Sequence, residues 1–372
     1  MRNVIRIKKK ALQDNLEAFQ DYCSNCLVTP ILKSNAYGHG LKEVYSILAE
    51  KNPEAIGVND AAEGELLRNL GFQKRLILVG PIHPDTLSQA YRLNAEISLA
   101  DQALLEAWLL SKEKPKAHLK VDTGLSRQGF TLDDTQKALE KILPHKEKLL
   151  GLFSHFANVE DVLEHQYAQK QLSQFKQAIK LTTNHQLNLE LHIASSASIL
   201  LLKESHYDLT RLGISLYGLW PSKTTKLSFE QVKTKPLTLT PALTWESELA
   251  SIKKIKEGTF VGYGCTFKAI KDMTIAVVPV GYNEGYPRLA SSHPQAHVLV
   301  RGHRCPILGR ICMNMLMIDV THIKDAAPFD KVTLIGTDGS ETIAAETLAE
   351  WADTIHYELL TRLNPGIERI IT

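Results

Sequence analysis

The sequence predicts an α/β protein in which an N-terminal (β/α)8 barrel of the TIM type, residues 1–235, precedes a mostly β domain, residues 236–372. Two observations predict this fold class. Short β-branched runs alternate with amphipathic segments up to about residue 218, which is typical of a parallel sheet. Strand-like runs then follow one another with turn signals between them. A chain of 372 residues accommodates one large and one smaller domain.

The barrel prediction depends on a series of short segments with strand character, separated by amphipathic segments such as 61–70, 84–93 and 134–143. An open doubly wound sheet has the same alternation. However, the first predicted strand lacks the Gly-x-Gly-x-x-Gly turn of dinucleotide-binding sheets. The predicted strands are 30–33, 55–58, 76–79, 96–99, 118–122, 149–155, 189–193 and 207–211.

The second domain is predicted from runs of strand-forming residues bounded by turn signals such as Gly258-Thr259 and Asp338-Gly339. One helix is expected near residues 344–351. The predicted strands of this domain are 249–255, 274–280, 296–300, 315–320 and 331–335.

Charge and hydropathy exclude several classes of protein. The formal net charge is +2 at pH 7 and lysines and arginines form no dense stripe, so we expect no nucleic-acid partner. No run is long and apolar enough to span a bilayer, and the N-terminal residues lack the apolar core of a signal peptide. We therefore expect a cytoplasmic protein without a membrane partner.

The five cysteines are scattered and odd in number, which does not suggest a disulfide framework. Cys23 and Cys26 have Cys-x-x-Cys spacing, but no second Cys/His pair with zinc-site spacing follows them. We therefore expect free thiols at a helix end and no metal.

The segment Lys33-Ser34-Asn35-Ala36-Tyr37-Gly38-His39-Gly40 carries the strongest functional signal. It follows the apolar run Pro30-Ile31-Leu32, predicted to be a buried strand that ends at Lys33. An apolar wall lowers the pKa of a lysine ammonium, and the neutral amine is a nucleophile suited to a Schiff base with an aldehyde cofactor. A solvent-exposed lysine at a strand end is the alternative. Other reactive residue types also stand at or shortly past predicted strand ends, where barrels carry functional residues: Arg127, His155, Ser195, Ser196 and Arg211.

Several motifs in order along the chain resemble those of the alanine racemase family, barrel-type enzymes that use pyridoxal 5'-phosphate. The segment at Lys33 resembles the family's cofactor-lysine signature. Further motifs are similar at 120–127, 154–157, 211–218, 262–264, 281–288, 309–313 and 362–365.

The resemblance implies that Lys33 binds the cofactor covalently and acts as one catalytic base. Tyr263 is implied to be the opposing base, contributed by the partner subunit of a homodimer with shared active sites. Racemisation needs this geometry, because a proton leaves one face of the α-carbon and returns to the other. The implied activity interconverts L-alanine and D-alanine, which supplies D-alanine for peptidoglycan.

The resemblance also implies the remaining site residues. Arg211 donates to the pyridine nitrogen, and His155 bonds Arg211 or packs near the ring. Arg127 and the backbone at Met313 take the substrate carboxylate. Lys120 is either carbamylated or an unmodified lysine. The cofactor phosphate is held by Tyr37, Ser196, the amides of Gly213 and Ile214, and Tyr357, and no metal takes part.

Two departures from the family pattern leave the substrate open. Ser195, a cofactor-binding position, stands where asparagine is usual, and Asn314 stands where aspartate is usual. A racemase acting on serine or a larger amino acid is therefore an alternative, although Tyr357 and Tyr263 are expected to narrow the pocket. A non-catalytic pyridoxal-phosphate carrier is a further alternative, against which the second domain argues.

Overall fold

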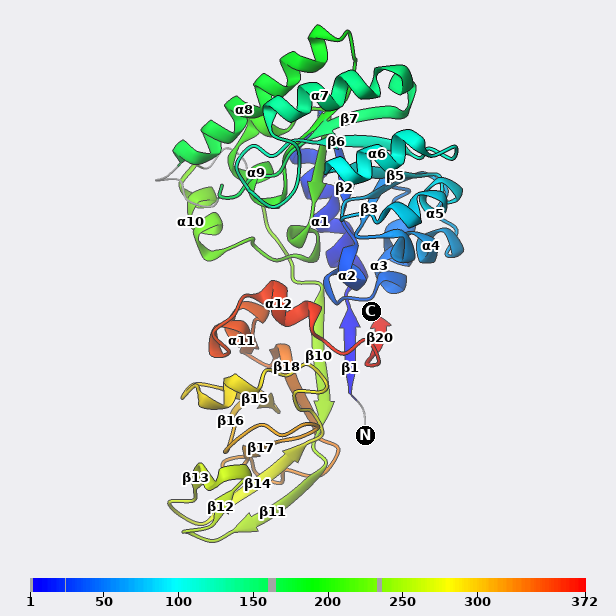
Figure 1. Ribbon diagram of the computed structural model, residues 1–372. Coiled ribbons are helices and arrows are strands. Elements are labelled where there is room, and N and C mark those ends of the chain that lie inside the picture. The colour runs from blue at the N-terminus through cyan, green and yellow to red at the C-terminus, as the bar shows by residue number, and fades with distance from the viewer. Residues whose placement is uncertain (1–2, 24, 160–164, 233–235) are drawn as a thin grey trace. The chain divides into compact units, whose positions relative to one another are not determined.

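The computed structural model describes residues 3–23, 25–159, 165–232 and 236–372, which fall into two compact units (Figure 1). The barrel unit comprises residues 10–34 and 44–241. The second unit comprises residues 1–9, 35–43 and 242–372. Two segments from the first part of the chain thus belong to the second unit. The predicted domain limit at residue 235 lies outside the described residues.

The barrel unit is built on parallel strands that follow one another in chain order from β3 to β8, while β2 pairs with β9. Isolated parallel bridges join Ile31 to Gly57 and Ser195 to Arg211, and thereby close the ring. This confirms the predicted (β/α)8 barrel. Its strands are β2 (Leu27–Pro30), β3 (Ala55–Val58), β4 (Arg75–Leu78), β5 (Ala95–Leu99), β6 (Lys116–Lys120), β7 (Leu149–Phe153), β8 (Glu190–His192) and β9 (Leu209–Leu212).

Helices connect these strands, and Figure 1 shows α4, α5 and α6 on the outer side of the strands they follow. Side chains before a helix cap its first turn, because free amides there need acceptors: Asp60 accepts from Ala62 and Glu63. The helices are α1 (Lys9–Tyr22), α3 (Leu41–Ala49), α4 (Ala61–Asn69), α5 (Leu87–Arg92), α6 (Gln102–Leu110), α7 (Leu132–Ile142), α8 (His165–Asn184), α9 (Ser196–Leu201) and α10 (Lys223–Val232), with 3-10 turns η1 (Pro84–Thr86), η2 (Leu143–Lys148), η4 (Lys203–Ser205) and η5 (Ile214–Tyr217). Among the described residues, no helix combines the length and the apolar character needed to cross a membrane.

The prediction of a strand over residues 30–33 is wrong in its limits. β2 ends at Pro30, and Lys33 begins a short helix, α2 (Lys33–Tyr37). This turn is left-handed, because φ lies between 52° and 57° at all four residues from Ser34 to Tyr37. Each non-glycine residue in this conformation costs roughly 1–2 kcal/mol, so the turn requires support from its surroundings.

The support comes from residues of the second unit. Asn35 accepts the amide of Leu41 on its side-chain oxygen at 2.8 Å, and the amide of Gly40 on its carbonyl at 3.0 Å. The guanidinium of Arg369 donates to the carbonyl of Gly38 from Nε at 3.1 Å and from Nη2 at 2.9 Å. These bonds satisfy the backbone that a left-handed turn leaves without regular partners.

The second unit is mostly β, as predicted. Its larger sheet has the strand order β16-β15-β18-β10-β1-β20, with β19 paired to β18, and its smaller sheets are β11-β14-β17 and β12-β13. The single helix expected near residues 344–351 is present, but a second helix follows it. The elements are β1 (Val4–Ile7), β10 (Leu243–Glu248), β11 (Ser251–Ile255), β12 (Phe260–Val261), η6 (Tyr263–Cys265), β13 (Phe267–Lys268), β14 (Met273–Val278), η7 (Arg288–Ser292), β15 (His297–Val300), β16 (His303–Pro306), β17 (Leu316–Asp319), β18 (Lys331–Asp338), β19 (Glu341–Ile343), α11 (Ala345–Trp351), α12 (His356–Thr361) and β20 (Glu368–Ile371).

Gly38 provides a test of the left-handed turn. Its φ is +81°, and an added Cβ would overlap the carbonyl oxygen of Leu360. Gly258 is a matched control with φ +84°, where an added Cβ meets only the Lys268 side chain at 3.9 Å. We expect Gly258→Ala to lower the free energy of unfolding by about 1 kcal/mol, and Gly38→Ala by roughly 3 kcal/mol or more. Urea denaturation measures both, and equal losses would contradict the close approach to Leu360.

Candidate functional site

Lys33 lies just past the carboxyl end of β2, on the side of the barrel where Lys120 and Arg211 end or nearly end their strands. It is half-buried, and burial lowers the pKa of its ammonium. The positive charges of Arg127 and Arg211 lower this pKa further, while Glu63 opposes them. Lys33 therefore has a larger fraction of neutral, nucleophilic amine at a given pH than an ordinary lysine.

Lys120 belongs to the same group of cations. It ends β6, is buried, and donates to the side-chain oxygen of Gln128 at 3.2 Å. Burial, then the charges of Arg127 and Arg211, lower the pKa of Lys120 to about 8. Four cations, Lys33, Lys120, Arg127 and Arg211, thus influence one another at the carboxyl ends of the strands. An anionic ligand relieves this mutual repulsion.

Arg211, on β9, is 7% exposed and held by several acceptors. Its Nη1 donates to Nδ1 of His192 at 2.6 Å, and its Nη2 to Nδ1 of His155 at 3.2 Å. Nη2 also donates to the carbonyls of Ser154 at 2.7 Å and Ile193 at 3.1 Å. Among the described residues no acceptor takes Nε–H. Burial, then Arg127, lowers the pKa of Arg211 to about 10, so the guanidinium stays charged at neutral pH.

The bonds of Arg211 determine the protonation of both imidazoles. A guanidinium only donates, so Nδ1 of His155 and of His192 must accept and cannot carry a proton. Burial, then the charge of Arg211, holds the pKa of each imidazole well below its usual value. Both rings are therefore neutral, with the proton on Nε2.

A buried chain of hydrogen bonds continues from His192 into the barrel. Its Nε2–H donates to Nδ1 of His118 at 2.9 Å. Nε2 of His118 therefore carries a proton and donates a hydrogen bond to Glu96 at 2.9 Å. Glu96 also accepts two bonds from Arg75, each 2.9 Å. Although burial opposes ionisation, His118 and Arg75 lower the pKa of Glu96 to about 2. Arg75 pairs in turn with Glu190 through two bonds of 2.8 Å.

Serine hydroxyls and backbone amides lie close together where α9 and η5 begin. The Ser196 hydroxyl is buried and accepts the amides of Gly213 at 3.0 Å and Ser215 at 3.4 Å. The Ser215 hydroxyl is buried without a hydrogen-bond partner among the described residues. Ile214 begins η5, directly after Gly213. Ser195 caps α9, where its amide donates to the Ser198 hydroxyl at 2.8 Å. The hydroxyls of Ser196 and Ser215 can donate to an oxyanion here.

Two further candidate residues meet within the second unit. The rings of Tyr37 and Tyr357 lie with centroids 6.3 Å apart and planes tilted by 55°. Tyr37 is buried, and burial raises the pKa of its phenol to about 12, so the group remains a hydroxyl donor at neutral pH.

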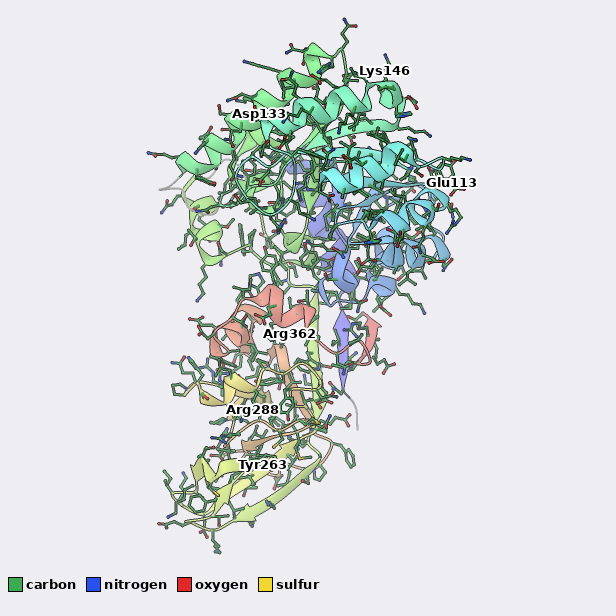
Figure 2. The ribbon with its side chains drawn as sticks, viewed as in Figure 1. Glu113, Asp133, Lys146, Tyr263, Arg288 and Arg362 are labelled. Atoms are coloured by element: carbon green, nitrogen blue, oxygen red, sulfur yellow. The ribbon has the colours of Figure 1, made fainter. Side chains whose placement is uncertain are left out.

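Tyr263 begins the 3-10 turn η6 and Met313 lies on a loop, and both are exposed residues of the second unit. Tyr263 is 73% exposed and is labelled in Figure 2, and Met313 is 57% exposed. The Met313 carbonyl accepts the amide of Asn283 at 2.8 Å. Nearby, the Asn314 amide donates to Glu284 at 2.8 Å. An aspartate at position 314 would place a second carboxylate beside Glu284 and lose this hydrogen bond.

The predicted site residues of the barrel are thus brought together at the strand ends, whereas Tyr37, Tyr357, Tyr263 and Met313 belong to the second unit. Our sequence reasoning missed the buried polar chain of His192, His118 and Glu96. A signal was present in the sequence, because Glu96 and His118 each begin a predicted strand of the barrel.

Comparisons with known proteins agree with this arrangement. Residues 7–221 match the family model described as alanine racemase, N-terminal domain, and residues 242–371 match that of the C-terminal domain. A curated protein of Leptospira interrogans serovar copenhageni, named alanine racemase, is 39% identical over 371 residues, covering 99% of this chain and 95% of that protein. The alanine racemase of Halothermothrix orenii is 34% identical, covering 93% and 90%.

Solved structures show the same fold. Alanine racemase from Bacillus anthracis with bound L-Ala-P has a TM-score of 0.90 and 28% identity, covering 100% of this chain and 95% of that one. Biosynthetic alanine racemase from Pseudomonas aeruginosa has a TM-score of 0.85 and 28% identity, covering 100% of both chains. Both domains of the family are matched in order along the chain. The protein therefore belongs to the alanine racemase family.

Proposed function

We propose that this protein interconverts L-alanine and D-alanine with pyridoxal 5'-phosphate as cofactor, as a homodimer in the cytoplasm, and that it supplies D-alanine for peptidoglycan. The observation that carries the proposal is the position of Lys33. Its amine has a lowered pKa and lies among three other cations at the carboxyl ends of the barrel strands. An amine of this kind attacks an aldehyde, and the cations suit a phosphate and a carboxylate.

The residues of the barrel unit fit the cofactor in chemical character. Lys33 offers the amine, and Arg211 keeps an Nε–H for a ring-nitrogen acceptor. Ser196, with the amides of Gly213 and Ile214, is proposed to hold the phosphate. The Ser215 hydroxyl, which has no hydrogen-bond partner within the described part of the chain, adds a donor there. Tyr37 and Tyr357 of the second unit are the remaining proposed phosphate ligands, and Ser195 is proposed to contact the cofactor.

The proposed proton transfers use two bases. Pyridoxal phosphate, held by these residues, would supply an aldehyde for the substrate amino group and a ring that accepts electrons from the α-carbon. Lys33 removes or returns that proton on one face, and Tyr263 of the partner subunit does so on the other. The 73% exposure of Tyr263 leaves its phenol accessible to a second copy of the chain.

Arg211 is proposed to govern which reaction follows. Its Nε–H would donate to the ring nitrogen of the bound cofactor and would not release a proton to it, because a guanidinium stays charged. Arg211 would thereby limit electron withdrawal by the cofactor ring and disfavour transamination. His155 keeps Arg211 in place by accepting from Nη2.

Arg127 and the Met313 backbone are proposed to bind the substrate carboxylate. Lys120 is proposed to orient Arg127, and its pKa of about 8 leaves a fraction of neutral amine that can react with carbon dioxide to a carbamate. A carbamate carries a negative charge and would attract the guanidinium of Arg127. The substrate preference for alanine is proposed to follow from the bulk of Tyr263 and Tyr357.

A direct assay tests the function. We expect the purified protein with pyridoxal phosphate to convert L-alanine to D-alanine faster than it converts serine or larger amino acids, measured by chiral chromatography. Borohydride reduction and peptide mapping should place the pyridoxyl group on Lys33, with Lys120 unlabelled as the internal control. Faster turnover of serine would overturn the substrate, and a label on another lysine would overturn the role of Lys33.

Tyr263→Phe tests the two-base proposal. We expect a loss of about 10²–10⁴-fold in racemisation, because a general base is removed. Exchange of the α-proton should persist from one enantiomer and fail from the other, measured by deuterium incorporation. Tyr91→Phe is a matched control, since Tyr91 is also an exposed tyrosine, lies on α5 outside the family motifs and has no proposed role.

Mixing Tyr263→Phe with Lys33→Ala chains tests the shared site. Exchange of subunits should create heterodimers with one intact site and restore part of the activity. Proven subunit exchange without any recovered activity would exclude catalysis by Tyr263 in the partner's site.

A further inference from the structure

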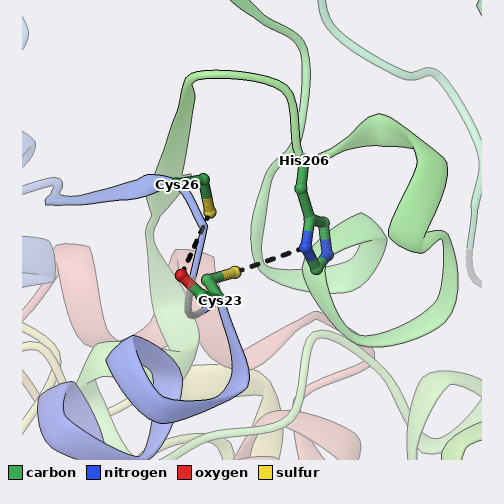
Figure 3. A group of neighbouring side chains, drawn as sticks. All are labelled: Cys23, Cys26 and His206. Carbon is green, nitrogen blue, oxygen red and sulfur yellow. Dashed lines mark hydrogen bonds between the residues drawn. The ribbon is translucent and has the colours of Figure 1, made fainter.

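Cys23, Cys26 and His206 form a cluster at the amino-terminal face of the barrel, opposite the strand ends that carry Lys33 and Arg211 (Figure 3). Cys23 follows α1, Cys26 stands directly before β2, and His206 lies three residues before β9. One sulfur or nitrogen atom from each residue lies within 4.8 Å of the other two. Cysteine and histidine are the ligands that zinc prefers in proteins.

The ring of His206 is oriented as a metal ligand. Its Nε2 lies 2.9 Å from the carbonyl of Ile199. A carbonyl only accepts, so Nε2 carries the proton and Nδ1 keeps its lone pair. Nδ1 is the atom that faces Cys23. Zinc-binding histidines are held in the same manner, with the second ring N–H donated to a carbonyl or carboxylate.

The distance between the Cys23 sulfur and the His206 ring also suits zinc. The Cys23 sulfur lies 3.6 Å from Nδ1 of His206. Zn–S bonds of about 2.3 Å and Zn–N bonds of about 2.05 Å at tetrahedral angles give an S···N separation of about 3.6 Å. The buried Thr210 hydroxyl lies 3.9 Å from the Cys26 sulfur and is placed to donate to a thiolate there.

We propose that Cys23, Cys26 and His206 bind one zinc ion, with water as the fourth ligand. Two thiol protons pass to solvent on binding, so two thiolates balance the charge of Zn²⁺. The ion joins residues 183 positions apart, at the place where β2 and β9 close the barrel. Its role is therefore structural, as a clip on the closure of the barrel, because the amino-terminal face of such barrels serves stability and not catalysis.

Metal analysis of the untagged holoenzyme tests the proposal. Protein kept reduced, given one equivalent of Zn²⁺ and dialysed against a non-chelating buffer should retain about one zinc per chain. The Cys23→Ser and Cys26→Ser variants should retain less than about a tenth of this zinc. Loss of a residue that only hydrogen-bonds to a metal ligand lowers metal affinity roughly 10–100-fold, and loss of a direct ligand lowers it further. Cys305→Ser is the control, because Cys305 is a buried free thiol outside the cluster. Absence of retained zinc, or equal retention by all variants, would overturn the site.

Two measurements on the unaltered chain remain informative if the variants fail to fold. Zn²⁺ should slow alkylation of Cys26 at least about tenfold and leave alkylation of the exposed Cys265 unchanged, as followed by mass spectrometry. Zn²⁺ should also raise Tm by about 3 °C or more with no change in racemase rate. Equal protection of Cys265, an unchanged Tm, or a racemase that requires zinc would contradict a structural clip.

Discussion

A guanidinium buried inside the barrel is the constraint on which the candidate site depends. Arg211 is 7% exposed, and a buried cation is tolerated only where hydrogen-bond acceptors surround it. Two carbonyls and two imidazoles supply these acceptors, and each imidazole accepts only while it is neutral. The charge of Arg211 itself contributes to this neutrality, because it lowers the pKa of both rings. The arrangement is therefore self-consistent, and it leaves Nε–H directed to no acceptor among the described residues.

The same constraint extends through the barrel interior. Because His192 accepts from Arg211, it must donate to His118, and His118 must donate to Glu96. Arg75 then neutralises Glu96 at the amino end of β4. Loss of one member would leave a buried polar group unpaired, at a cost of about 1–3 kcal/mol, or more for a charge. The orientation of Arg211 is thus connected to residues at the opposite end of the strands.

The sequence predicted the barrel and the residues at its strand ends because carboxyl ends of parallel strands meet at one face. His155, Ser196 and Arg211 could be identified in this way. The left-handed turn after Lys33 could not, because local preferences oppose positive φ at four successive non-glycine residues and only bonds such as that from Arg369 stabilise it. The chain from His192 to Glu96 depends on the register between strands, which hydrophobic periodicity does not report. The placement of β1 beside β20 depends on pairing between the two ends of the chain.

The central claim is that Arg211 donates to the cofactor ring nitrogen as a permanently charged guanidinium. The most direct test is the ¹⁵N chemical shift of the ring nitrogen in protein reconstituted with ¹⁵N-labelled pyridoxal phosphate. Free cofactor at acid and alkaline pH supplies the reference shifts for the protonated and unprotonated nitrogen. Our account predicts an unprotonated, hydrogen-bonded nitrogen with a shift that stays constant between pH 6 and pH 9, because the guanidinium of Arg211 stays charged in this range and releases no proton to the ring. The shift of a protonated pyridinium nitrogen in this range would contradict it.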